Sequence, residues 1–363
     1  MWAMVVKEFR QLRRDRRTLA LMIVLPVLLL VVFGYAASFE VATIRTRVVG
    51  PQAEQVAGAL RRPFAVDQVE PAGTRADAVA DLRDGRVPAA VVADDDGVTV
   101  LLDGSELFTA MAAQQAMARL QVGDNGPPGI DVDVLFNEDL DTSVVMVPGL
   151  AGLILLFIGT VITSLGVVRE RQAGTLEQLA VMPLRPRDVF LGKIAPYFLV
   201  AAIDLAVVLG VGVALFDVPF RGSALVLALG SLLYLFVALG LGVLISSVSQ
   251  NQGQAIQLAM MALLPQVLLS GLIFPVASMG AGVRWISYLL PLTYFTRISR
   301  GVMIRGAGLA ALWPSFAYLA VLGVVVVTLA TLRFRRDLAP APMRQAKRRP
   351  RLAGATSEVG DGR

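Results

Sequence analysis

The chain has 363 residues, of which 56% are hydrophobic and 17% are charged, and its formal net charge is +5. Soluble domains carry about 25% charged residues, so this composition is that of an integral membrane protein. Histidine and cysteine are both missing from the sequence, which excludes imidazole and thiolate metal sites, disulfides and histidine-based catalysis. The GxxxxGK[ST] and GxSxG motifs are also missing, so nucleotide chemistry would have to come from another chain.

Residues 1–17 are expected to form an amphipathic helix in the cytoplasmic interface of the membrane, with basic residues around an apolar stripe. The stripe consists of Trp2, Val5, Val6, Phe9 and Leu12. The apolar run 18–39 that follows is the first predicted transmembrane helix. Its basic approach and its Ala36-Ala37-Ser38 end also fit a cleaved signal peptide. Signal-peptide cores have roughly 7–15 residues, so the longer run here favours an uncleaved anchor.

Residues 40–143 are expected to form an extracytoplasmic α/β domain with the order β-α-β-α-β-β-α-β. The strands are predicted at 41–49, 64–69, 89–93, 98–102 and 131–136, and the helices at 53–62, 75–85 and 107–121. The acidic turn Asp94-Asp95-Asp96 could bind Ca²⁺, but a solvated turn is the better interpretation. The segment 40–143 holds 8 basic and 18 acidic residues, a net charge of −10, so the rest of the chain carries +15.

Residues 144–332 are expected to form the transmembrane core. Five apolar runs each have roughly the 20 residues that cross a bilayer, at 144–168, 194–216, 223–248, 254–274 and 309–332. The segment 275–308 is too polar for a span and too apolar for a loop, so we interpret it as a re-entrant pair of short helices. With the first span, the fold class is an all-α membrane protein of six transmembrane helices with an inserted α/β domain.

Lysine and arginine are concentrated in three segments, which are residues 1–17, 169–193 and 333–363. The positive-inside rule therefore predicts that all three segments and both termini face the cytoplasm. The last segment is a basic tail that we expect to be disordered. Because the basic charge follows from topology, it indicates contact with membrane lipids and no nucleic-acid partner.

The loop 169–193 joins two predicted spans and has an order of its own. Gly174 is expected to end the preceding helix, and Thr175 can cap a new one with Gln178 three positions on. Leu176 and Leu179 then fall on one side of a short amphipathic helix, with Glu177 on another. On residue pattern alone, anchoring at the membrane surface and docking to a partner are equally good explanations.

Family resemblance favours docking. The loop matches a signature of the form (R/K)ERExGTxExLxxxP followed by GK through Arg169, Glu170, Arg171, Gly174, Thr175, Glu177, Leu179, Pro183, Gly192 and Lys193. In this it resembles the coupling region of the ATP-binding-cassette type-2 exporter permeases, although Gln172 departs from the pattern. Further matches, such as Phe136-Asn137 and Arg300-Gly301, extend the resemblance over nearly the whole chain.

The resemblance implies that the loop docks into a cytoplasmic ABC ATPase. Glu170, Thr175, Glu177 and Gln178 would supply polar contacts, Leu176 and Leu179 apolar contacts, and Gly174 the helix break. It also implies two ATPase subunits that carry the ATP and Mg, and a second copy of this permease or a related one. The chain itself would need no cofactor and would catalyse no reaction, and its place would be the bacterial plasma membrane.

Asp204 is the one acidic residue near the middle of a predicted span. A carboxylate inside a bilayer is by default a functional candidate, with a hydrogen-bonded packing residue as the alternative.

Taken with the family resemblance, the sequence predicts the permease subunit of an ATP-driven exporter for an amphiphilic drug, a lipid or a similar molecule. Two alternatives stay open, namely an ion-coupled secondary transporter that uses Asp204 and a non-transporting sensor whose 40–143 domain binds a ligand.

Overall fold

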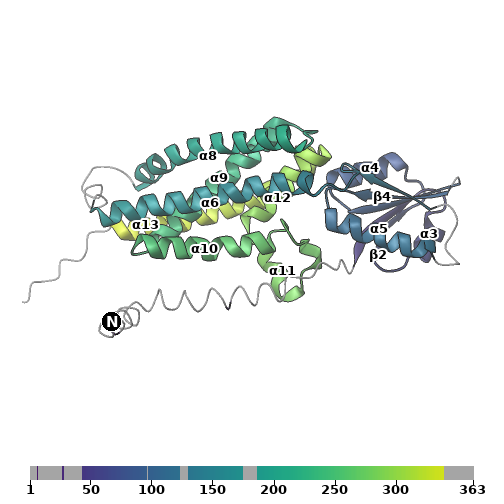
Figure 1. Ribbon diagram of the computed structural model, residues 1–363, viewed down its shortest axis with the longest axis horizontal. Coiled ribbons are helices and arrows are strands. Elements are labelled where there is room, and N and C mark those ends of the chain that lie inside the picture. Colours follow the sequence, from purple (N-terminus) through teal and green to yellow (C-terminus); the bar gives the residue numbers. More distant parts are fainter. Residues whose placement is uncertain are drawn as a thin grey trace, which may run out of the picture.

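The computed structural model describes residues 43–95, 97–122, 130–174 and 186–338, together with Val6 and Val27. These residues form an α/β domain and a bundle of long helices, arranged end to end along the long axis of the molecule (Figure 1). The expected interfacial helix 1–17, the first span 18–39 and the tail beyond 338 lie outside the described residues, apart from Val6 and Val27.

The α/β domain has the element order that the sequence predicts. Its elements are β1 (Ile44–Val49), α3 (Ala53–Ala59), β2 (Phe64–Glu70), α4 (Arg75–Asp84), β3 (Ala89–Asp94), β4 (Gly97–Asp103), α5 (Leu107–Val122) and β5 (Ile130–Leu135). The strands form one sheet in the order β2-β1-β3-β4-β5. The β3–β4 pair is antiparallel and the other pairs are parallel.

Helices cover both faces of this sheet, because alternate strand residues point to opposite sides. One face packs against α3 and α5 through Ile44, Val48, Val91, Val100, Ala113 and Met117. The other face packs against α4 through Val49, Ala78, Leu82, Val92 and Leu101. A capping box starts α4, in which the Thr74 side chain accepts from the Asp77 amide and Asp77 accepts from the Thr74 amide. The hydrogen bonds from Thr74 lower the pKa of Asp77.

The bundle contains five long helices within the described residues. They are α6 (Thr142–Gln172), α8 (Pro186–Phe216), α9 (Ala224–Val248), α10 (Gln252–Leu269) and α13 (Leu309–Leu338). Four of them, α6, α8, α9 and α13, contain stretches that are long and apolar enough to cross a membrane. This agrees with a membrane α protein.

The predicted span 254–274 differs from the structure. The helix α10 begins at Gln252, ends at Leu269 and is not among the four apolar spans found in the described residues. It has only 18 residues, four of which are glutamines, and Gly271 follows in a left-handed conformation with φ +86°. The count of six spans therefore stays a prediction.

Two short helices occupy the segment that follows α10. After the single turn η1 (Val276–Ser278) come α11 (Ala281–Ser287) and α12 (Pro291–Arg300), and α12 continues into a π-helix, η2 (Gly301–Arg305). These elements lie at the end of the bundle that meets the α/β domain (Figure 1).

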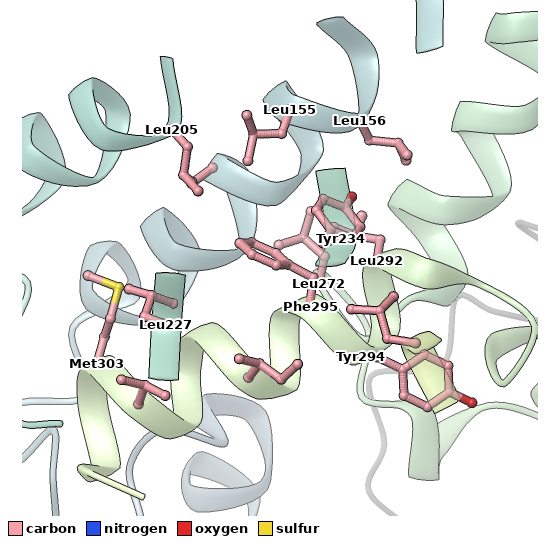
Figure 2. Close-up of a cluster of buried hydrophobic side chains, with 14 of the residues drawn as sticks. Leu155, Leu156, Leu205, Leu227, Tyr234, Leu272, Leu292, Tyr294, Phe295 and Met303 are labelled. Carbon is pink, nitrogen blue, oxygen red and sulfur yellow. The ribbon is translucent and has the colours of Figure 1, made fainter. Parts of the chain in front are cut away.

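The centre of the bundle is a cluster of apolar side chains around α9. Tyr234 of α9 is fully buried, and its hydroxyl donates to the carbonyl oxygen of Gly152 in α6 at 2.9 Å. Its ring stacks on Phe295 of α12 with centroids 4.5 Å apart. Figure 2 shows the two rings among surrounding leucines, which include Leu272 and Leu292. A single contact site thus joins α6, α9 and α12.

Close approach of α6 and α9 depends on Gly242. A Cβ atom at this position would lie 2.8 Å from the Thr163 Cβ and 2.9 Å from the Thr160 carbonyl oxygen. In contrast, a Cβ at Gly210 of α8 would meet nothing within 4 Å in the described part of the chain. Both glycines belong to small-xxx-small patterns in the sequence, but only Gly242 packs tightly.

We expect Gly242→Ala to lower the free energy of unfolding by about 1–3 kcal/mol, because the added methyl group would force α6 and α9 apart. Gly210→Ala should leave stability unchanged or slightly higher, since alanine favours helix. Thermal unfolding of the two detergent-purified variants measures the difference. Equal melting temperatures would show that the α6–α9 contact is not tight.

Candidate functional site

The predicted coupling residues begin in the last turn of α6, at the end of the bundle remote from the α/β domain (Figure 1). Gly174 ends this helix as predicted, since it adopts the left-handed conformation with φ +74°. The Ala173 amide donates to the Arg169 carbonyl oxygen at 2.9 Å, and the Gly174 amide donates to the Arg171 carbonyl oxygen at 3.2 Å. These contacts give α6 a defined C-terminal end at Gly174.

The structure places only part of the predicted docking set. Glu170 lies partly buried in the last turn of α6, four residues before Gly174. The other members lie outside the described residues, and they are Thr175, Leu176, Glu177, Gln178 and Leu179. Their helix, its capping box and its contacts stay predictions.

Arg171 has a structural role that its place in the sequence pattern does not reveal. Its Nη1 donates to the carbonyl oxygens of Ser249 at 2.8 Å and Ser246 at 3.2 Å. These two carbonyls belong to the end of α9, where helix geometry leaves oxygens without intrahelical partners and the helix dipole favours a positive charge. Arg171 thus ties the end of α6 to the end of α9.

A second polar contact ties the start of α10 to the same place. The Gln252 side chain donates to the Gln172 side-chain oxygen at 3.0 Å. The turn between α9 and α10 is itself ordered, because the Asn251 side chain accepts from the Gln254 amide at 2.9 Å as the N-cap of α10. The loop after α6 therefore leaves from a point where three helix ends are held together.

Asp204 lies in the middle of α8 and is separate from the coupling residues. It is about 27 Å along the helix from Pro186, at 1.5 Å per residue. Its Oδ2 atom is buried and has no hydrogen-bond partner in the described part of the chain. Among the described ranges, no group of three or more acidic side chains could hold a metal ion.

A buried arginine connects the helices at the opposite end of the bundle. Arg300, the last residue of α12, donates through Nε to the Val145 carbonyl oxygen at 3.0 Å. Its Nη1 and Nη2 donate to the carbonyl oxygens of Gly271 at 3.1 Å and Leu272 at 3.0 Å. In the sequence, Arg300 stands out only as part of a family match. The contacts join α12 to the first turn of α6 and to the segment after α10.

Known proteins with similar sequences identify the family of this chain. Residues 16–332 match the family model described as ABC-2 family transporter protein. Two proteins of Escherichia coli K12, the probable multidrug ABC transporter permeases YbhS and YbhR, are each 30% identical to the chain over 364 residues. These alignments cover 93% of this chain and 97% and 99% of the two relatives. The inner membrane transport permease YhhJ of the same organism is 33% identical over 221 residues, 59% of this chain and 58% of that protein. Since the family model and two relatives span most of the sequence, the chain belongs to the ABC-2 family of transporter permeases.

Proposed function

We propose that this permease moves an amphiphilic, drug-like or lipid-like molecule out of the plasma membrane, driven by two ABC ATPase subunits that dock on the loop after α6. The observation that carries the proposal is the platform formed by Arg171 and Gln172, which joins the start of this loop to the ends of α6, α9 and α10. Movement of the loop would therefore displace three helices together. The names of the relatives YbhS and YbhR support a multidrug substrate.

The proposed orientation places the coupling loop in the cytoplasm and the α/β domain outside. Exposed arginines at the coupling end, among them Arg169 and Arg333, fit a cytoplasmic face. Exposed aromatic side chains lie towards the other end, on α11 and at the start of α13, and include Trp285 and Trp313. Tryptophan is enriched where a bilayer meets water, so these residues support an outer membrane boundary beneath the α/β domain.

In the assembled exporter, two permease copies or this chain and a similar one would face each other, each with six spans. The first span 18–39 and α10 would complete the six, and α11 and α12 would form the re-entrant pair. ATP and Mg would bind to the ATPases, and this chain would need no cofactor of its own. Closure of the ATPases would push the docking helix, and the Arg171 contacts would pass that displacement to α9.

An ion-coupled secondary transporter is the second candidate function. The observation in its favour is the Oδ2 atom of Asp204 in the middle of α8, which is buried and has no hydrogen-bond partner among the described residues. A protonatable group in that position is typical of proton relays. The two functions differ in their energy source, so they can be separated by experiment.

The docking proposal predicts that Glu170→Ala/Glu177→Ala weakens the association with an ATPase, because both carboxylates are expected to face it. The tagged permease is purified from host membranes in mild detergent, and co-purifying proteins are identified by mass spectrometry. An ATPase with Walker motifs should accompany the wild type and decrease about tenfold or more with the double variant. The exposed acids of the α/β domain provide a matched control, Glu54→Ala/Asp67→Ala. Equal recovery from all three proteins would contradict docking through these carboxylates.

The Arg171 contacts predict a separation of ATP hydrolysis from transport. Arg171→Ala removes two charge-assisted hydrogen bonds, each of about 1.5–3 kcal/mol, between the end of α6 and the end of α9. Because movement of the loop would then no longer be passed to α9, efflux of ethidium should fall about tenfold or more. ATPase recovery and basal hydrolysis should stay near the wild-type level, since the docking residues remain. Arg333→Ala removes an exposed arginine at the same end and should change neither quantity. Wild-type efflux by Arg171→Ala would refute its role.

Asp204 provides the test between the two energy sources. If ATP drives transport, Asp204→Asn should keep ethidium efflux within about threefold of the wild type, because the amide can fill the same space. In inside-out vesicles supplied with ATP, an uncoupler that collapses the proton gradient should likewise leave ethidium transport into the vesicles intact. Loss of efflux under both conditions would favour the secondary transporter.

A further inference from the structure

Asp103, Gly104 and Ser105, at the end of β4, form a corner of the α/β domain that contacts the helix bundle. Asp103 is almost completely buried, with a side chain that is 1% exposed. Its Oδ1 accepts from the Ser105 amide at 2.9 Å, and its Oδ2 accepts from Arg305 Nη1 at 3.2 Å. Burial raises the pKa of this carboxyl, and the nearby Arg305 offsets part of that effect. The contact between the domain and the bundle therefore contains a buried carboxyl group that is paired with an arginine.

Arg305 is the bundle's side of this contact. It ends η2, and its side chain is only 9% exposed. Its guanidinium also packs on Gly85 at the end of α4, where a Cβ atom would lie 2.9 Å from Nη2. The same π-helix is held by the α8–α9 connection, since the Arg221 amide donates to the Met303 carbonyl oxygen at 3.0 Å. π-Helical segments are rare in proteins, and those that occur are often found at functional sites.

Asn137 fixes the other connection at this corner. Its Nδ2 donates to the Gly104 carbonyl oxygen at 3.3 Å and to the Asp141 carbonyl oxygen at 3.1 Å, while its Oδ1 accepts from the Asp141 amide at 3.0 Å. Asp141 is the N-cap residue of α6. The segment from β5 to α6 is therefore tied to the residue next to Asp103.

The backbone of this connection supports the same conclusion. Phe136 and Leu140 have φ values of +71° and +52°, a left-handed conformation that residues other than glycine seldom adopt. Such conformations persist only where the surrounding contacts determine them. A Cβ atom on Gly104 would lie 2.5 Å from the Asn137 carbonyl oxygen, so the chain segments here touch directly. The link between the α/β domain and α6 is thus a fixed connection.

We propose that the Asp103–Gly104 corner is a joint through which the α/β domain couples the start of α6 to η2, so that the outer ends of α6, α12 and α13 move together during transport. The transport part rests on the proposed function. Helix α6 runs without interruption from this joint to the coupling loop, 31 residues or about 46 Å. Displacement of the loop by an ATPase would therefore reach the joint along one helix. Arg305 and Asn137 act as positioning residues and need not touch the transported molecule.

Distance measurements between spin labels test the joint without an ATPase or a transported molecule. Because the chain has no cysteine, Glu54→Cys on α3 and Leu309→Cys at the start of α13 carry the only labels in the full chain, reconstituted in lipid nanodiscs. Both positions are exposed. The wild-type background should give one narrow distance distribution, which fixes the reference width.

The single variant Arg305→Met would leave the buried Asp103 carboxylate without its arginine and could misfold. The double variant Asp103→Asn/Arg305→Met is therefore used to test whether the joint exists. This pair of changes leaves no unmatched charge, and the distribution should broaden about twofold or more. Asp133→Asn is the matched control, because it breaks an ion pair with Arg75 inside the same domain and should keep the wild-type width. A wild-type width for the double variant would overturn the joint.

Ethidium efflux tests the transport part. The double variant should lose about fivefold or more of the efflux while the ATPase still co-purifies. Broad distances with wild-type efflux would overturn the claim that the joint serves transport. If the wild type neither exports ethidium nor binds an ATPase, the proposed function fails, and the spin-label widths still decide whether the joint exists.

Discussion

Arginine side chains that donate to backbone carbonyls hold this helix bundle together at both ends. A carbonyl group that is freed at a helix end and shielded from water must be satisfied by the protein itself. Arg171 does this for the end of α9, and Arg300 does it for the segment after α10 and for the first turn of α6. A guanidinium has five donors in a fixed plane, so one side chain can join two or three helices. The positions of the helix ends, and of the loops that leave from them, depend on these contacts.

The middle of the bundle is built differently from its ends. There the helices approach through small residues, such as Gly152 and Gly242, and the Tyr234 ring fills the space between α6, α9 and α12. Dense apolar packing resists local deformation, so a displacement at one end is passed on as movement of whole helices. Rigid helices between two polar platforms are suited to carry movement from one end of the bundle to the other.

Local signals in the sequence predicted much of this fold. The strands of the α/β domain and the helix break at Gly174 are each determined by a few neighbouring residues, and each was placed correctly. The end of α10 was predicted five residues too late, because the apolar run continues past Ser270-Gly271 although the helix does not. The contacts of Arg171, Arg300 and Arg305 join residues 28 to 202 positions apart, and no periodicity within one sequence reveals them. The docking helix rests on family resemblance, since Thr175 to Leu179 lie outside the described residues.

The single antiparallel pair in the sheet determines how the domain can be inserted in the chain. The strands β1, β2 and β3 run in one direction, and the β3–β4 turn makes β4 and β5 run in the other. The end of the sheet that holds Asp103 and leads into α6 is therefore also the end at which β1 begins. The chain enters and leaves the domain at the same end of the sheet, so the domain is an insertion with both of its connections on one side. The far end of the domain points away from the bundle (Figure 1).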